Sequence, residues 1–131
     1  MGVYKGGARY YHNISENIST TSKFYDYSDG YFGKKSKKKG NFVRIIESNN
    51  PLKTSKDFYD RISYGGEETP LSNGKGTRTS TEDGTIITYR PTISSDGSPV
   101  VDIYIENSTN TGGLKKQKIH FVEVKKKWKL K

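Results

Sequence analysis

The strand pattern that decides the fold is clearest in residues 82–90, Glu82-Asp83-Gly84-Thr85-Ile86-Ile87-Thr88-Tyr89-Arg90. The first three residues are typical of a hairpin turn, and the β-branched and aromatic residues after them favour a strand. Working outward, similar runs occur in residues 75–80, 100–106 and 117–124. Turn-forming Ser, Asp, Gly and Pro residues separate these runs. The sequence therefore predicts four antiparallel strands in meander order.

One amphipathic helix is predicted ahead of these strands, at about residues 54–64. Thr54 is a suitable N-cap, and Gly65-Gly66 ends the element. The apolar stripe between them consists of Phe58, Tyr59 and Ile62. A short helix around residues 14–23 is also compatible with the sequence, and residues 42–46 form either a strand or the start of a helix. The predicted fold class is α+β, with an N-terminal helix or helices packed on a four-stranded antiparallel sheet.

Positive charge is concentrated at the two ends of the chain. The net charge is +9; residues 1–40 contain eight Lys/Arg and three acids, and residues 115–131 contain eight Lys/Arg and one acid. We predict a basic, mostly irregular arm over residues 1–40 and a domain over residues 41–131 that ends in a basic tail. Clustered positive charge attracts phosphate polymers such as nucleic acid, and the alternative is a solubilising surface.

The composition and the spacing of residues also exclude several kinds of site and of enzyme. Because there is no cysteine, the chain can form neither a disulfide framework nor a thiolate zinc site. No run approaches the ~18 to 20 apolar residues of a membrane span, so we expect no membrane insertion by this domain. The spacings of metal-dependent nucleases, a Walker loop and a G-x-S-x-G elbow are also absent from the sequence.

Strand alternation indicates which side chains share the face of the sheet away from the core. Apolar residues at every second position, such as Ile103 and Ile119, are expected on the core side. The opposite face then gathers Thr88, Arg90, Asp102, Tyr104, Lys118 and His120.

This set matches the requirements of RNA cleavage without a metal or cofactor. A base must take the proton from the 2′-hydroxyl, an acid must protonate the leaving oxygen, and cations must stabilise charge on the phosphate. His120 is the candidate acid/base, because an unperturbed imidazole has a pKa of about 6.5. Arg90 is the candidate phosphate clamp, and Thr88 offers a hydroxyl to orient the substrate. The candidate substrate-binding residues are Tyr104, Lys118, Lys75 and Arg78.

The same residues also have a simpler interpretation. An antiparallel sheet with one face in water always has a polar face, and a lone histidine there is more often ordinary surface. Arg90 could pair with Asp102 across the strands. Asp57 and Asp60 are expected to be solvated positions on the helix, and His12 in the polar arm has no expected role.

Five short motifs within residues 40–124 carry a resemblance to a known group of proteins. They are Asn41-Phe42-Val43-Arg44, Asp57-Phe58-Tyr59 with Gly65-Gly66, Asp83-Gly84-Thr85-Ile86-Ile87-Thr88-Tyr89-Arg90, Ser98-Pro99-Val100-Val101-Asp102-Ile103 and Gln117-Lys118-Ile119-His120-Phe121. Together they resemble the C-terminal toxin domains of bacterial polymorphic toxins, which include contact-dependent and LXG-type secreted effectors. Many such domains are similar to the barnase, EndoU, colicin D and RelE group of metal-independent ribonucleases.

The resemblance implies an endoribonuclease that is secreted as part of a larger toxin and delivered into the cytoplasm of a rival cell. It would cut RNA, with tRNA as one plausible substrate, and an acidic immunity protein would protect the producer. The resemblance places the active residues on the exposed sheet face, which gives Thr88, Arg90 and His120, assisted by Tyr104 and Lys118. With one histidine in the domain, the two-histidine scheme of EndoU does not carry over, and a Lys, Arg or Tyr would fill the second role.

Two other functions are compatible with the sequence. The first is a non-catalytic nucleic-acid-binding module that stacks bases on exposed tyrosines and follows the backbone with lysines. The second is a DNase toxin, which the lack of metal-ligand spacings disfavours.

Overall fold

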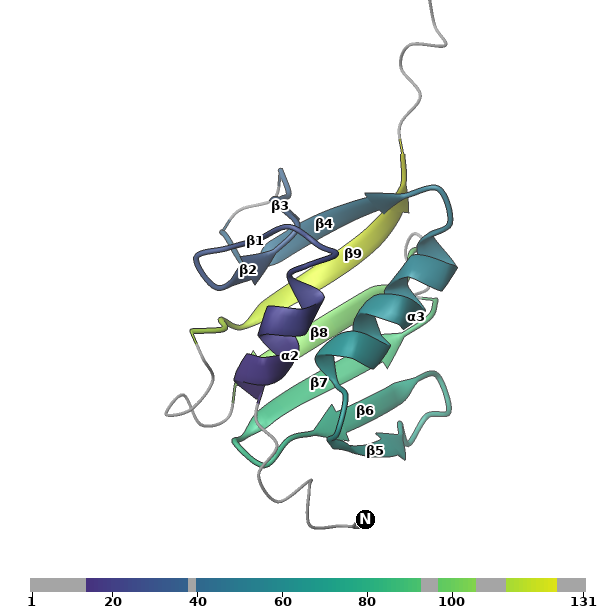
Figure 1. Ribbon diagram of the computed structural model, residues 1–131. Coiled ribbons are helices and arrows are strands. Elements are labelled where there is room, and N and C mark those ends of the chain that lie inside the picture. The colour runs from purple at the N-terminus through teal and green to yellow at the C-terminus, as the bar shows by residue number, and fades with distance from the viewer. Residues whose placement is uncertain (1–13, 38–39, 93–96, 106–112, 125–131) are drawn as a thin grey trace, which may run out of the picture.

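The computed structural model describes residues 14–37, 40–92, 97–105 and 113–124 (Figure 1). The helices are α2 (Ile14–Thr21) and α3 (Pro51–Ile62). The strands are β1 (Tyr27–Ser28), β2 (Tyr31–Phe32), β3 (Lys34–Lys35), β4 (Val43–Ser48), β5 (Glu67–Pro70), β6 (Thr77–Ser80), β7 (Thr85–Arg90), β8 (Val100–Ile105) and β9 (Gln117–Glu123). His12 and the basic residues 125–131 lie outside the described residues.

Seven strands form one mixed sheet in the order β3-β4-β9-β8-β7-β6-β5, and β1 and β2 form a separate two-stranded sheet. Neighbouring strands of the large sheet are antiparallel except for β4 and β9, which run parallel. The predicted fold class, α+β with a four-stranded antiparallel sheet, is therefore wrong. The described part of the chain is mostly β, with a seven-stranded mixed sheet and two helices.

The error has two physical sources. The runs that alternate in sequence do form adjacent antiparallel strands, β6 to β9. β5, however, has the sequence Glu67-Glu68-Thr69-Pro70 with every residue exposed, so its pairing with β6 leaves no apolar signal. β3 is a pair of exposed lysines. β4 pairs with β9 although α3 and four strands separate them along the chain, and no local pattern encodes such a contact.

The core lies between the two helices and one face of the large sheet (Figure 1). β7 shows the alternation directly, because Thr85, Ile87 and Tyr89 are buried while the residues between them are partly exposed. Aromatic rings fill the centre of the core: the Phe58 ring lies 5.0 Å from that of Phe32 and 5.5 Å from that of Phe121. These edge-on and tilted contacts join α3 to β2 and β9.

Helix α3 begins three residues before the predicted start at residue 54 and ends two residues before the predicted end at residue 64. Asn50 is its N-cap, with the side-chain oxygen accepting a hydrogen bond from the Lys53 amide at 3.2 Å, and Pro51 is its first residue. Thr54, the expected cap, lies inside the helix. The preceding strand β4 ends at Ser48, and Pro51 is accepted in the first turn of the helix because an N–H there would have no partner within the helix.

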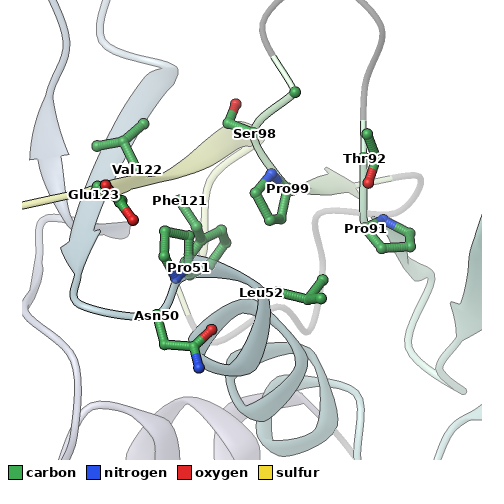
Figure 2. Close-up of a pocket in the computed structure, with 11 residues that line it drawn as sticks. Asn50, Pro51, Leu52, Pro91, Thr92, Ser98, Pro99, Phe121, Val122 and Glu123 are labelled. Atoms are coloured by element: carbon green, nitrogen blue, oxygen red, sulfur yellow. The ribbon is translucent and has the colours of Figure 1, made fainter.

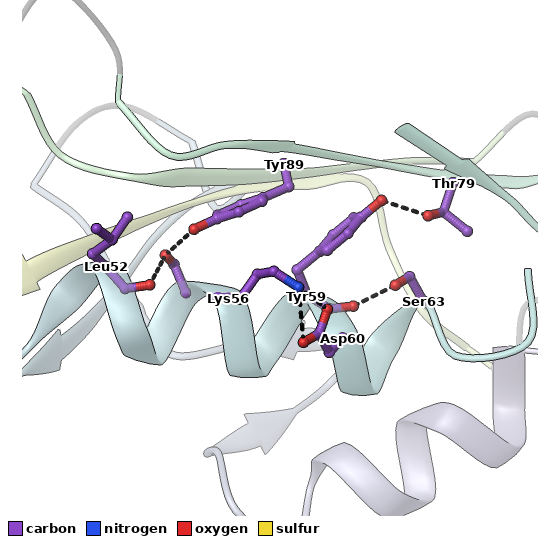
Figure 3. Close-up of polar contacts among 8 residues, drawn as sticks. Leu52, Lys56, Tyr59, Asp60, Ser63, Thr79 and Tyr89 are labelled. Atoms are coloured by element: carbon purple, nitrogen blue, oxygen red, sulfur yellow. Dashed lines mark hydrogen bonds and ion pairs between the residues drawn. The ribbon is translucent and has the colours of Figure 1, made fainter. Parts of the chain in front are cut away.

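Two hydroxyl contacts hold α3 over β6 and β7 (Figure 3). The Tyr59 hydroxyl lies 2.5 Å from Thr79 Oγ1, and Ser55 Oγ lies 3.0 Å from the Tyr89 hydroxyl. The rings of Tyr59 and Tyr89 stack with their centroids 5.2 Å apart. These buried contacts satisfy polar groups that the tyrosines bring into the core.

Residues 14–36 belong to the folded unit. The short helix that the sequence allowed around residues 14–23 is confirmed as α2, and it contributes Ile14 and Ile18 to the core. The Ile14 amide donates a hydrogen bond of 2.9 Å to Asp83 Oδ2, so the β6–β7 hairpin supplies an acceptor at the start of α2. Asn17 Nδ2 in turn donates to the main-chain oxygens of Ile62 and Tyr64, at the end of α3.

Candidate nucleic-acid interface

The face of the large sheet opposite α2 and α3 is called the open face below, because no described helix covers it (Figure 1). Strand register places residues in rows that cross the sheet. The His120 row consists of Lys34, Ile45, His120, Val100 and Arg90. The adjacent Lys118 row consists of Val43, Lys118, Asp102, Thr88, Arg78 and Thr69. The structure thus brings most of the predicted site residues together in two neighbouring rows.

His120 and Arg90 lie on the same row, two strands apart, with Val100 between them. Neighbouring strands are about 4.8 Å apart, so the backbones of β9 and β7 are separated by roughly 10 Å at this row. Val100 is fully buried, and it lies outside the main core cluster. Because Val100 has no exposed surface, its neighbours cover it, and a phosphate in this row would bind over that cover with an imidazole on one side and a guanidinium on the other.

Arg90 forms an ion pair with Asp102, which is the simpler interpretation that the sequence also allowed. Arg90 Nη1 lies 2.5 Å from Asp102 Oδ2, and the two side chains are 38% and 31% exposed. A half-exposed pair of this kind contributes little to stability, but it fixes the orientation of the guanidinium. Since a guanidinium has five N–H donors, one such contact is compatible with phosphate binding through the others.

Ser98 is a neighbour of the imidazole that sequence reasoning missed. Its Oγ lies 3.3 Å from His120 Nδ1, and both side chains are partly buried. A partner on Nδ1 orients the ring and influences which nitrogen carries the proton. Ser98 lies in the segment before Pro99 that the sequence indicated only as a turn, where no alternation shows which way a side chain faces.

Lys118 is the cation nearest to His120 along β9. The two residues are two positions apart on one face, a spacing of about 7 Å along the strand. Lys118 is also directly opposite Asp102 on β8. Thr88 faces Asp102 from the other side, on β7, and Arg78 follows on β6.

Tyr104 lies on the open face but apart from His120. It is opposite Ile86 and is 49% exposed. It is four positions from Val100 along β8, so it is roughly 13 Å from the His120 row. Of the two candidates for a second acid/base on this face, Lys118 therefore lies close to His120, whereas Tyr104 lies farther away.

Lys75 lies in the turn between β5 and β6 and meets Arg90 across a hollow. This hollow has a volume of about 560 Å³ and is lined by Asn73, Gly74, Lys75, Gly76, Arg90, Pro91 and Thr92. The hollow lies at the β7 end of the His120 row. Thr77, the first residue of β6, pairs with Tyr89, so the turn residues before Thr77 lie level with Arg90 and beyond it.

A second hollow lies at the start of α3 and has a volume of about 450 Å³ (Figure 2). Its lining includes Pro51, Leu52, Pro91, Ser98 and Glu123. None of the candidate catalytic or substrate-binding residues lines it, although Ser98 also touches the imidazole. A third hollow, of about 420 Å³, lies beside β4 and includes Asp26 and Glu47.

Charge on the open face is uneven. Arg78, Arg90 and Lys118 lie near its centre, with Asp102 as the carboxylate between them. At the β4 edge, Lys34 Nζ lies 3.8 Å from Glu47 Oε1. Positive charge therefore dominates over β6 to β9 and is more nearly balanced at the edge.

Within the described ranges, no group of three or more His, Cys, Asp or Glu side chains is arranged to hold a metal ion. Neither described helix has the length and apolar character needed to cross a membrane.

No protein-family model, curated protein or solved structure matches this chain.

Proposed function

We propose that the domain is a metal-independent endoribonuclease that binds the RNA backbone across the open face, with His120 as its acid/base. The observation that carries this proposal is the His120 row, in which an imidazole and a guanidinium flank one buried valine. The Lys118 row adds cations directly beside it.

The chemistry needs two proton transfers and one stabilised phosphate. His120 takes the proton from the 2′-hydroxyl, and the 2′-oxygen attacks the adjacent phosphorus as the bond to the 5′-oxygen breaks. Arg90 and Lys118 bind the phosphate oxygens as negative charge builds on them. The leaving 5′-oxygen receives a proton, either from a second group or from water. Lys118 is the positioned candidate for that second role, since it shares the face and the strand with His120.

The sequence resemblance supports a biological role for this activity. A domain similar to polymorphic-toxin C-termini would be secreted within a larger protein, delivered to the cytoplasm of a competing bacterium and neutralised in the producer by an acidic immunity protein. The central cations of the open face supply a surface on which such a protein would bind.

Incubation with total bacterial RNA in EDTA, read on a denaturing gel, tests the proposal. We expect the wild type to cleave RNA and His120→Ala to lose about 10²- to 10⁴-fold in rate, the contribution typical of a positioned acid/base. His12→Ala is the matched control, because it removes the other histidine of the chain. Cleavage that survives in His120→Ala would contradict the assignment of His120.

A non-catalytic RNA-binding module is the second candidate. The Arg90–Asp102 ion pair favours it, because an arginine in an ordinary surface ion pair needs no role in catalysis. It predicts that wild type and His120→Ala bind RNA equally and that neither cleaves it. A plasmid substrate with and without Mg²⁺ tests the DNase alternative in the same assay.

A further inference from the structure

The hollow beside Lys75 has a positively charged lining, which suits an extension of the RNA site beyond the phosphate at Arg90. Its lining combines two cations, an asparagine, two glycines, Pro91 and Thr92, with no carboxylate among the described residues. The two other hollows each include an acidic residue, Glu123 in one and both Asp26 and Glu47 in the other. An anionic ligand is therefore favoured at this hollow over the others.

Its size suits one nucleotide. Small-molecule sites commonly have volumes of about 300–1,000 Å³, and this hollow has about 560 Å³. The pyrrolidine ring of Pro91 and the aliphatic stems of Lys75 and Arg90 provide apolar surface for a planar ring, while their charged groups provide contacts for a phosphate.

The β5–β6 turn forms one wall of the hollow, and its glycines let it lie close to β7. A side chain at Gly76 would place its Cβ 2.1 Å from the Tyr89 carbonyl oxygen, so only glycine allows the β5–β6 turn to approach β7 here. Gly74 has a φ of +73°, and nothing lies within 4 Å of the Cβ position it lacks. Gly76 thus lets the turn approach β7 closely, and no atom fills the space beside Gly74; Lys75, between these two glycines, lines the hollow together with Pro91.

Arg90 connects the hollow to the open face. It lines the hollow, and it belongs to the His120 row. A nucleotide in the hollow would therefore have its phosphate on the same guanidinium that faces His120 across Val100.

We propose that the hollow between the β5–β6 turn and Pro91-Thr92 is a single-nucleotide subsite, which binds the base and phosphate of the nucleotide next to the bond that is cut. This subsite rests on the proposed ribonuclease function. Lys75 and Arg90 hold the phosphate, and Pro91 packs against the base.

An NMR titration of the His120→Ala variant with nucleoside 3′-monophosphates tests the subsite. The same variant, which we expect to cleave RNA slowly, can then be titrated with an RNA oligonucleotide. We expect the amide signals of Gly74, Lys75, Gly76 and Thr92 to shift together and to saturate. Lys75→Met, which keeps the aliphatic stem and removes the charge, should weaken binding about fivefold, the upper range for one exposed charge contact. Lys53→Met, an exposed lysine on α3, is the matched control and should bind like the parent.

Three outcomes would overturn the subsite. Equal shifts with inorganic phosphate alone would show an anion site without base recognition. Shifts at Lys118 and the His120 position, with none in the turn, would remove the subsite and leave the proposed function intact. No shift with mononucleotide or with an RNA oligonucleotide, together with no cleavage by the wild type, would remove both.

Discussion

At the residue scale, Asp102 sets how much positive charge Arg90 presents. The carboxylate pairs with Arg90 at 2.5 Å and lies opposite Lys118, so it offsets charge at the centre of the open face. Under the proposed function, Asp102→Asn should tighten RNA binding by a few-fold, since it removes repulsion of the phosphates at nearly constant shape. Fluorescence anisotropy with a labelled RNA, in the His120→Ala background, measures this.

Asp60→Asn is the matched control for that experiment. Asp60 is also an exposed carboxylate in an ion pair, with Lys56 at 2.7 Å, but it lies on α3 on the other side of the sheet. Each variant removes one negative charge, so the net charge of the two variants is the same. Equal tightening by both would mean that overall charge governs binding, which would contradict a site on the open face.

Arg44 is a second residue whose effect follows from its contacts. It is buried, and its guanidinium donates hydrogen bonds of 2.9–3.1 Å to the main-chain oxygens of Phe32, Gly33 and Asn41. Burial lowers the pKa of Arg44 from its ordinary value. Arg44→Met should reduce the free energy of unfolding by about 2–4 kcal/mol, because these acceptors would lose charged donors. Urea denaturation measures the change.

Lys35→Met is the control for Arg44. Lys35 is paired with Arg44 in register, but its side chain is exposed, so we expect a change within about 0.5 kcal/mol. A similar small effect for Arg44→Met would show that the three carbonyl contacts do not support the fold.

At the element scale, a polar cluster links α3 to the segment after α2. Asp57 Oδ2 accepts hydrogen bonds from the Tyr25 hydroxyl at 2.6 Å and from Arg61 Nε at 2.8 Å, and the Arg61 guanidinium lies 3.9 Å from the centre of the Phe24 ring. Asp57 was expected to be a solvated helix position. The structure instead makes it one of several contacts between the two segments, although its side chain remains partly exposed.

This cluster predicts a dependence of stability on pH. Partial burial alone would raise the pKa of Asp57, but hydrogen bonds from Arg61 and Tyr25 outweigh it and hold the pKa below its ordinary value. A carboxyl with a depressed folded-state pKa stabilises the fold above its unfolded pKa of about 4, and that contribution is lost as the pH falls through the folded-state value. The difference in unfolding free energy between wild type and Asp57→Asn should therefore be constant above about pH 5 and shrink below pH 4.

Tyr25→Phe provides the matched variant for this test. It removes one of the two donors, so its acid-induced loss should be smaller than that of the wild type. A difference between wild type and Asp57→Asn that stays the same from pH 7 to pH 3 would contradict the role of these hydrogen bonds.

At the scale of the whole molecule, the net charge of +9 should make RNA binding weaken as the salt concentration rises. Removing cations from one face at a time shows which of them cause this dependence. The double variant Arg78→Ala/Lys118→Ala removes two cations from the open face. Each phosphate contact on a single strand contributes about 0.7 to the slope of log K against log salt, so the slope should fall by roughly 1.4. Anisotropy titrations at several salt concentrations measure it.

Lys23→Ala/Lys53→Ala is the control with the same net charge. Both lysines are exposed; Lys53 lies on α3, and Lys23 follows α2. We expect its slope to match the parent. An equal fall in both double variants would indicate a diffuse electrostatic attraction without a defined interface.

The sequence by itself determined the central strands, most of helix α3 apart from its first turn, and the set of polar residues on one face. Alternation in β7, β8 and β9 fixes which side chains face the core, because a strand with one buried face must place apolar residues at every second position. For that reason Thr88, Arg90, Lys118 and His120 could be assigned to a shared face before their neighbours were known.

The tertiary structure alone decided which strands flank the central four and how the face residues line up. The parallel pairing of β4 with β9 and the exposed edge strand β5 join segments without a local apolar signal. The rows that place His120 level with Arg90, and Ser98 beside the imidazole, depend on register between distant strands and on a turn. Local periodicity reports the burial of a residue in its own strand, whereas register and pairing depend on the packing of the whole sheet against α2 and α3.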